Sequence, residues 1–258
     1  MKSLVRFSLP LLAAVVVPLH AADAPPSMSA SELAAKMSAL QKDGSALVKL
    51  KLDTGGSTTQ VQIKQRRGGS STELVYQVLW PKDRMGEGVL LRKSGGSFSG
   101  ATRTLPDTIK NLDAGQLKDP LLGSALSYAD VVENFFDWDQ QTIVSTEVVD
   151  RATCQILESK PGKSDRSPYA AVRTWVDTRR LVPLKVEKYV SGGQPARRIT
   201  TTRVVTDDMG RHIPANLTIQ NLQSGVTTEL DGSRLKHGVT FTDQDFTAEG
   251  IKNVSAPR

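Results

Sequence analysis

The sequence predicts a mainly β protein, built on a single curled antiparallel sheet that forms an incomplete barrel, with two or more helices covering its concave side. Apolar residues recur at every second position along most of the chain, which is the periodicity of strands with one buried face. Short turns rich in glycine separate these runs, and no helix lies between successive strands, as parallel βαβ units would require. Two helices cannot cover both faces of about ten to eleven strands, so we expect the sheet to curl around its own apolar side.

The composition is that of one globular domain. The chain has 258 residues, of which 38% are hydrophobic and 23% charged, enough apolar material for a core and too much for a disordered chain. A single cysteine excludes an internal disulfide and a cysteine-based metal cluster. No shift in composition marks a boundary, so we expect residues 29–258 to form one domain.

The first 21 residues have the features of a cleaved signal peptide. Lys2 and Arg6 supply the positive charge, residues 7–17 form the apolar stretch, and Ala21 stands at the cleavage position. The apolar stretch is shorter than the ~20 residues that span a bilayer. We therefore expect export to the periplasm, a flexible tether over residues 22–28, and no membrane span in the mature chain.

The first helix and the first strands have clear periodicities. Residues 29–44 predict a helix that is capped by Ser29, carries Glu32 three residues later, and ends at Gly44. Residues 45–52, 58–66 and 72–80 then alternate as strands joined by glycine turns.

The pattern continues to the C-terminus. Residues 88–93 and 96–100 predict a hairpin, and residues 101–123 a long loop. A second helix is predicted to begin at Ser127, with Asp130 completing its cap. Its apolar face would carry Val131, Val132, Phe135 and Phe136. Further strands are predicted over residues 142–149, 152–159, 169–177, 181–190, 197–206, 213–221 and 226–231.

Residues suited to catalysis are scarce. His212 and His237, the histidines after the signal peptide, lack the spacing of a catalytic triad, and we expect both at the surface. Cys154 fits a buried strand position, and the basic residues between 173 and 203 fit the outer face of the sheet. We therefore predict no enzyme activity, no cofactor, no metal site and no binding of nucleic acid.

The apolar faces suggest a cavity for an apolar ligand. A plain hydrophobic core is the alternative, but a sheet with this many strands encloses more volume than two short helices fill. The residues predicted to line the cavity are Val48, Leu50, Val61, Ile63, Tyr76, Val78, Trp80, Val131, Val132, Phe135, Phe136 and Trp175.

Short motifs in the second half of the chain resemble those of the LolA-like outer-membrane lipoprotein-sorting proteins. Residues 123–130 resemble the stretch G-S-x-x-S-Y-x-D, and residues 154–161 resemble C-x-x-L-E-x-x-P. Matches to W-V-D, P-x-K-x-E-x-Y and a closing F-T-x-x-x-L follow in the same order, up to Ile251. The motif residues singled out are Ser127, Tyr128, Asp130, Trp175, Asp177, Pro183, Lys185 and Glu187. The resemblance implies an incomplete barrel closed by helices, with a cavity for acyl chains, in the periplasm.

The expected function is that of a periplasmic carrier that binds a lipid or the acyl chains of a lipoprotein for transfer towards the outer membrane. Its partners would include an inner-membrane transporter or an outer-membrane acceptor. The alternative is an accessory protein that carries no ligand and docks to an inner-membrane lipid or export transporter. In the carrier, we expect the helix with Phe135 and Phe136 to act as a lid over the cavity.

Overall fold

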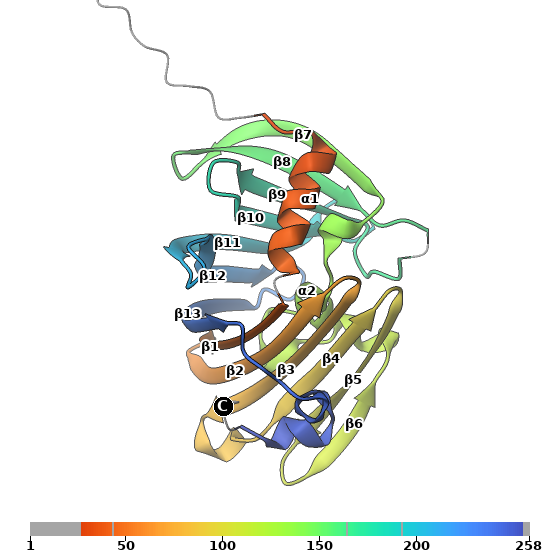
Figure 1. The fold of residues 1–258 in the computed structure, drawn as a ribbon, viewed down its shortest axis with the longest axis vertical. Coiled ribbons are helices and arrows are strands. Elements are labelled where there is room, and N and C mark those ends of the chain that lie inside the picture. Colours follow the sequence, from red (N-terminus) through yellow and green to blue (C-terminus); the bar gives the residue numbers. More distant parts are fainter. Residues whose placement is uncertain (1–26, 43, 164, 192, 255–258) are drawn as a thin grey trace, which may run out of the picture.

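The protein consists of one 13-stranded antiparallel sheet whose two ends do not meet, in a computed structural model that describes residues 27–42, 44–163, 165–191 and 193–254. The strand order is β6-β5-β4-β3-β2-β1-β13-β12-β11-β10-β9-β8-β7, so β6 and β7 are the edges of an open half-barrel (Figure 1). The predicted fold class is thereby confirmed. The predicted signal peptide, residues 1–21, lies outside the described residues, and so does most of the predicted tether. No helix in the described part of the chain has the length and apolar character needed to cross a bilayer.

The two halves of the sheet are each built from consecutive hairpins. The first half comprises β1 (Gly44–Thr54), β2 (Ser57–Gly68), β3 (Ser71–Trp80), β4 (Gly88–Ser94), β5 (Ser97–Thr104) and β6 (Thr108–Leu112). The second comprises β7 (Gln140–Val149), β8 (Ala152–Lys160), β9 (Ala171–Asp177), β10 (Val182–Tyr189), β11 (Pro195–Thr206), β12 (His212–Asn221) and β13 (Thr227–His237). Pairing of β1 with β13, from Ala46–His237 to Thr54–Thr228, joins the halves into one sheet.

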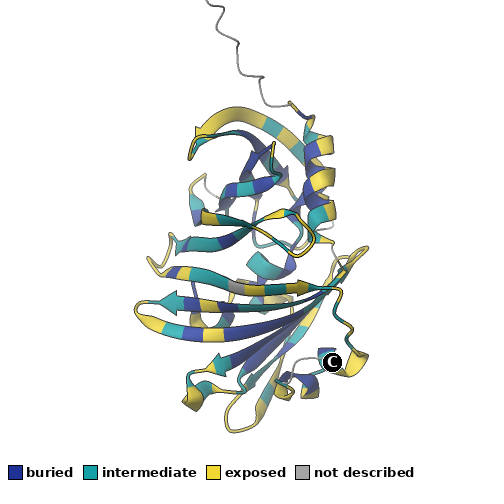
Figure 2. Ribbon diagram, turned by 60° about the vertical axis from the view of Figure 1, so that its left-hand side comes forward, coloured by how far each residue is buried: buried dark blue, intermediate teal, exposed yellow. Residues whose placement is uncertain are grey.

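Helix α1 (Ala30–Gln41) lies across the concave side of the sheet (Figure 1). Its cap is the predicted one, because the Ser29 hydroxyl accepts a hydrogen bond from the amide of Glu32 at 3.2 Å. Leu33, Ala34 and Met37 are buried against the sheet, while the opposite face of the helix is exposed (Figure 2). The helix ends before Gly44, which is the first residue of β1 and has a positive φ of 80° that favours glycine.

The predicted second helix is shorter than expected. Helix α2 (Tyr128–Val132) begins at Ser127 with the predicted cap, in which Asp130 completes a capping box. It ends at Val132, and Phe135–Asp137 form a separate 3-10 turn, so the prediction of one helix carrying both phenylalanines is wrong. The side-chain amide of Asn134 donates to Ser38 of α1 at 3.1 Å and to Asp137 at 3.0 Å, contacts that hold this segment in its non-helical conformation.

The predicted loop over residues 101–123 contains regular structure. It includes the end of β5, the short polar strand β6, and 3-10 turns at Ala114–Lys118 and Leu121–Gly123. Strand β6 is an edge strand with no fully buried residue, although Ile109 and Leu112 pack in part against the core clusters. Such a strand lacks the apolar alternation on which the prediction of about ten to eleven strands depended.

The core lies between the concave face and the segments that cover it. Its main cluster contains apolar residues of β1–β4 and of β8–β12, together with α1, α2 and the turns that follow α2. A smaller cluster on the other face of β3–β5 is covered by Phe246 and Ile251 of the C-terminal 3-10 turns Asp243–Phe246 and Glu249–Lys252. A third cluster, on β8–β10, contains Cys154, whose predicted burial is confirmed.

Candidate functional site

A cavity of about 790 Å³ lies between the C-terminal half of α1 and the middle of the sheet. Helix α1 contributes Met37 and Leu40, and the facing strand β1 contributes Val48 and Leu50. The remaining apolar lining comes from β10 to β13 and the turns beside them: Leu181, Pro183, Val205, Ile213, Pro214, Ala215, Leu230, Gly232 and Leu235.

Small residues make room for this cavity. Gly232 is the cross-strand partner of Leu50, so no side chain projects from β13 at this position. A Cβ atom at Gly232 would lie only 2.8 Å from the carbonyl oxygen of Ala215, so the backbones of β12 and β13 approach closely here. Ala215 is the small residue that lines the cavity on β12.

One side of the cavity carries a charged cluster of Asp207, Asp208, Arg211 and His237, hereafter the rim cluster. Arg211 donates to Asp207 through Nε at 2.8 Å, and a guanidinium nitrogen of Arg211 lies 2.7 Å from Nε2 of His237. Nδ1 of His237 contacts a carboxylate oxygen of Asp208, and the backbone amide of His237 donates to the other at 2.9 Å. The cluster ties the turn between β11 and β12 to the end of β13.

The two acids of the rim cluster are held in their charged form. The hydrogen bonds from His237 lower the pKa of Asp208. Burial by itself raises the pKa of Asp207, but the hydrogen bonds from Arg211 and from the Met209 amide outweigh it, so that this pKa is also lowered.

The rim cluster also contains three groups that bind metals in other proteins. Ligand atoms of Asp207, Asp208 and His237 lie within 4.8 Å of one another. Arg211 already engages both Asp207 and His237, so a cation would have to displace a guanidinium. We therefore assign no metal to the cluster.

The expectation that both histidines are surface residues is wrong for His237, whose side chain is only 6% exposed and packed into the rim cluster. No local sequence pattern indicates that His237 joins the rim cluster, because Asp207, Asp208 and Arg211 are about 30 residues away in the chain.

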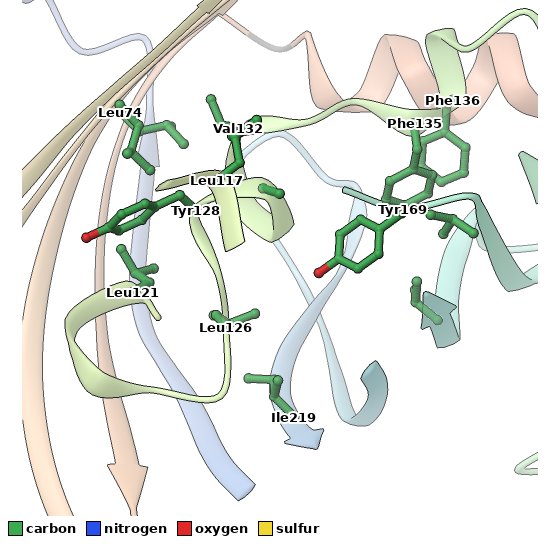
Figure 3. Packing of buried hydrophobic residues seen from close by; sticks show 14 of the residues in the cluster. Leu74, Leu117, Leu121, Leu126, Tyr128, Val132, Phe135, Phe136, Tyr169 and Ile219 are labelled. Atoms are coloured by element: carbon green, nitrogen blue, oxygen red, sulfur yellow. The ribbon is translucent and has the colours of Figure 1, made fainter. Parts of the chain in front are cut away.

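Of the residues predicted to line a cavity, Val48 and Leu50 line this one. The others of the concave face are packed in the main core, where the rings of Phe135 and Phe136 lie side by side beside Tyr169 (Figure 3). Their ring centroids are 4.4 Å apart. These core residues are Val61, Ile63, Tyr76, Val131, Val132, Phe135 and Phe136.

The remaining predicted lining residues lie elsewhere. Trp80 is 45% exposed at the end of β3, because a register shift between β2 and β3 interrupts the alternation just before it. Val78 is buried but belongs to none of the clusters and does not line the cavity. Trp175 packs in the third cluster with Cys154, and its indole nitrogen donates to Glu147 at 2.7 Å.

The motif residues around Asp130 form a buried ionic network under the core. The side chain of Asp130 is fully buried and makes ion pairs of 2.9 Å with both Lys188 and Arg197. Tyr169 donates to the same carboxylate at 2.7 Å. Ser127 and Asp130 form the capping box at the start of α2, and Tyr128 is buried in the adjacent core. Lys188 and Arg197 therefore do not lie on the outer face, contrary to the prediction.

Most of the other motif residues make contacts within the sheet. Lys185 lies over the ring of Trp175, 3.6 Å from its centre. Asp177 accepts from Arg180 at 2.6 Å, and Glu187 accepts from Arg198 at 2.9 Å. Pro183 alone among the motif residues lines the cavity.

This fold defines the class of protein. A putative outer-membrane lipoprotein-sorting protein domain from Vibrio parahaemolyticus superposes with a TM-score of 0.77 at 21% identity, over 86% of this chain and 98% of that one. A LolA superfamily protein from Nitrosomonas europaea superposes with a TM-score of 0.65 at 18% identity, over 86% and 98% of the two chains. The protein thus has the LolA-like half-barrel fold.

The family is shown by a family model that matches residues 105–253, which is more than half of the chain. The chain belongs to this family, whose members are described as uncharacterized proteins. A DUF1329 family protein from Desulfovibrio piger has a TM-score of 0.78 at 18% identity, over 86% of this chain and 97% of that one. None of the curated proteins matches the chain.

Proposed function

We propose that this protein is a periplasmic carrier that binds an acyl chain, from a lipid or a lipoprotein, in the cavity under α1. The cavity carries this proposal, because it is an apolar space between a helix and the concave face of a LolA-like half-barrel. The names of the similar structures, one for lipoprotein sorting and one for the LolA superfamily, agree with such a ligand.

The size and chemistry of the cavity fit one linear chain. A methylene group occupies roughly the volume of a water molecule, so a chain of about 16 carbons needs on the order of 500 Å³. The cavity has about 790 Å³, within the range of small-molecule sites. Each methylene buried there contributes about 0.8 kcal/mol, which gives an apolar chain a large driving force.

The test is a titration with a fluorescent fatty acid, together with native mass spectrometry of protein purified from the periplasm. Wild-type protein should bind the probe and retain lipid or acylated peptide during purification. Ile213→Glu places a carboxylate in the apolar lining, and the bound chain would exclude the water that solvates it. We expect its affinity to fall at least tenfold, which corresponds to about 1.4 kcal/mol.

The matched control is Val148→Glu, the same kind of change on β7 at a side chain that is 67% exposed and away from the cavity. It should bind the probe like wild type. Leu230→Trp, which adds volume at another lining residue, should weaken binding without adding charge. Equal affinities for wild type and both lining variants, or no binding by wild type at all, would contradict the proposed function.

A further inference from the structure

Strands β12 and β13 pair along only part of their length. Their ladder runs from Gln220–Thr227 to Asn216–Asp231 and stops there in the part of the chain that the structure describes. The two backbones still approach closely at Ala215 and Gly232; beyond these residues, β12 continues to His212 and β13 to His237. Residues from both of these diverging stretches line the cavity, so the cavity reaches the split between the two strands.

Irregularities in three neighbouring strands produce this split. The register between β11 and β12 shifts on both sides of the Arg203–Asn216 pair, and that between β1 and β13 shifts between Lys49 and Leu50. Such bulges bend and twist the strands that contain them. Pro214 of β12, which is the cross-strand partner of Val204 on β11, also has no amide hydrogen to donate to a ladder.

The rim cluster bridges the far end of the split. The carboxylate of Asp208, in the turn that precedes β12, accepts a hydrogen bond from the backbone amide of His237 at 2.9 Å. In a complete sheet, a carbonyl of the neighbouring strand would accept this bond. Because an arginine can only donate, its contact with Nε2 makes that nitrogen the acceptor and leaves Nδ1 to donate to Asp208. Side chains rather than a backbone ladder therefore hold the two strands together here.

We propose that the split between β12 and β13 is the lateral entrance through which a single acyl chain reaches the cavity, and that the rim cluster is the latch that closes it. This inference rests on the proposed function. An apolar chain can pass between two strands whose backbone ladder has ended, once a few side-chain contacts open. A ladder would instead have to break bond by bond, leaving buried amides without partners.

The latch is tested by stopped-flow kinetics with the fluorescent fatty acid cis-parinaric acid. Asp208→Ala removes both contacts with His237, and we expect association and dissociation rate constants to rise together by about tenfold, the effect of one charge-assisted hydrogen bond. The equilibrium constant should stay within about twofold of wild type, because the latch closes over free and occupied cavity alike. Asp208→Asn, a smaller change, should give the same pattern with smaller factors.

The matched control is Asp231→Ala on β13, which removes an ion pair with Arg203 of β11; Asp231 does not line the cavity. Both of its rate constants should equal those of wild type. Unchanged rates in Asp208→Ala would overturn the proposal, and so would a changed affinity with one rate unaffected, since Asp208 would then contact the ligand.

A second measurement needs no ligand. Amide hydrogen exchange in residues 212–215 and 232–237 should be faster in Asp208→Ala than in wild type and unchanged in Asp231→Ala. Equal exchange in wild type and Asp208→Ala contradicts the latch. Absence of probe binding by wild type contradicts the carrier function instead, so the two failures can be told apart.

Discussion

At the scale of single residues, Asp130 connects elements that are far apart in the sequence. Its carboxylate caps α2 and is the shared counter-ion of Lys188 on β10 and Arg197 on β11. Burying three charges costs desolvation energy, which their mutual attraction offsets. The loss of one partner would leave the others buried without compensation.

Asp130→Asn should therefore lower the free energy of unfolding by about 3–5 kcal/mol, the usual cost of breaking a buried ion pair. Urea denaturation measures this change. The control is Glu32→Gln, which removes an exposed pair with Lys36 on α1 and should cost less than about 0.5 kcal/mol. Equal losses in the two variants would show that the buried network adds nothing beyond a surface ion pair.

The same residue predicts an acid-dependent loss of stability. Burial raises the pKa of Asp130, but Lys188 and Arg197 outweigh this effect and lower it below the ordinary value. Protonation thus weakens the folded state, so the contribution is complete above about pH 4 and disappears as the pH falls through the folded-state pKa. Wild type should lose more stability than Asp130→Asn between pH 6 and pH 3, and parallel curves would contradict this assignment.

The Ser127 cap was predictable, because cap and partner are three residues apart. The cations that neutralise Asp130 were not predictable from the sequence. Lys188 and Arg197 are residue types that usually lie at the surface, and no local pattern distinguishes a buried lysine from an exposed one.

At the scale of elements, the segment after α2 is a packed part of the core. Phe135 and Phe136 are 7% and 4% exposed, and Phe135 also contacts Trp138 at a ring distance of 6.2 Å. Neither ring lines the cavity, so the sequence-based prediction that they form a lid has no support in the geometry.

Phe135→Ala should lower the free energy of unfolding by about 3–5 kcal/mol, as expected for a large side chain in a filled core. The affinity for the fluorescent fatty acid should stay within about twofold of wild type, because Phe135 does not line the cavity. Chemical denaturation and probe titration measure the two effects. A small loss of stability together with a tenfold change of affinity would contradict this account and support the lid hypothesis.

Most strands were predictable because their apolar residues alternate along the chain, as Val61 and Ile63 do on β2. The prediction failed where tertiary contacts decide the structure. Strand β6 forms because β5 offers it an edge, and the turn at Phe135 forms because Asn134 bonds to α1. Neither partner is visible in the local sequence.

At the scale of the whole molecule, the cavity arises where the two halves of the sheet meet. Alternation indicates which residues share a face, but not whether side chains from another segment fill the space above them. Here the filled region lies under α2 and the following turn, and the open region lies under α1 beside Gly232 and Ala215. The position of the cavity depends on the pairing of β1 with β13, which links residues almost 200 positions apart.

Methyl NMR with a spin-labelled fatty acid tests the location of the ligand most directly. The nitroxide would be placed near the methyl end of a stearic acid, with a diamagnetic analogue as the reference. We predict that the label broadens the methyl signals of Ile213 and Leu230, which line the cavity, and leaves those of Leu74 and Leu91 sharp, because both are fully buried and neither lines the cavity. Broadening of Leu74 and Leu91 with sharp signals for Ile213 and Leu230 would contradict an acyl-chain site under α1.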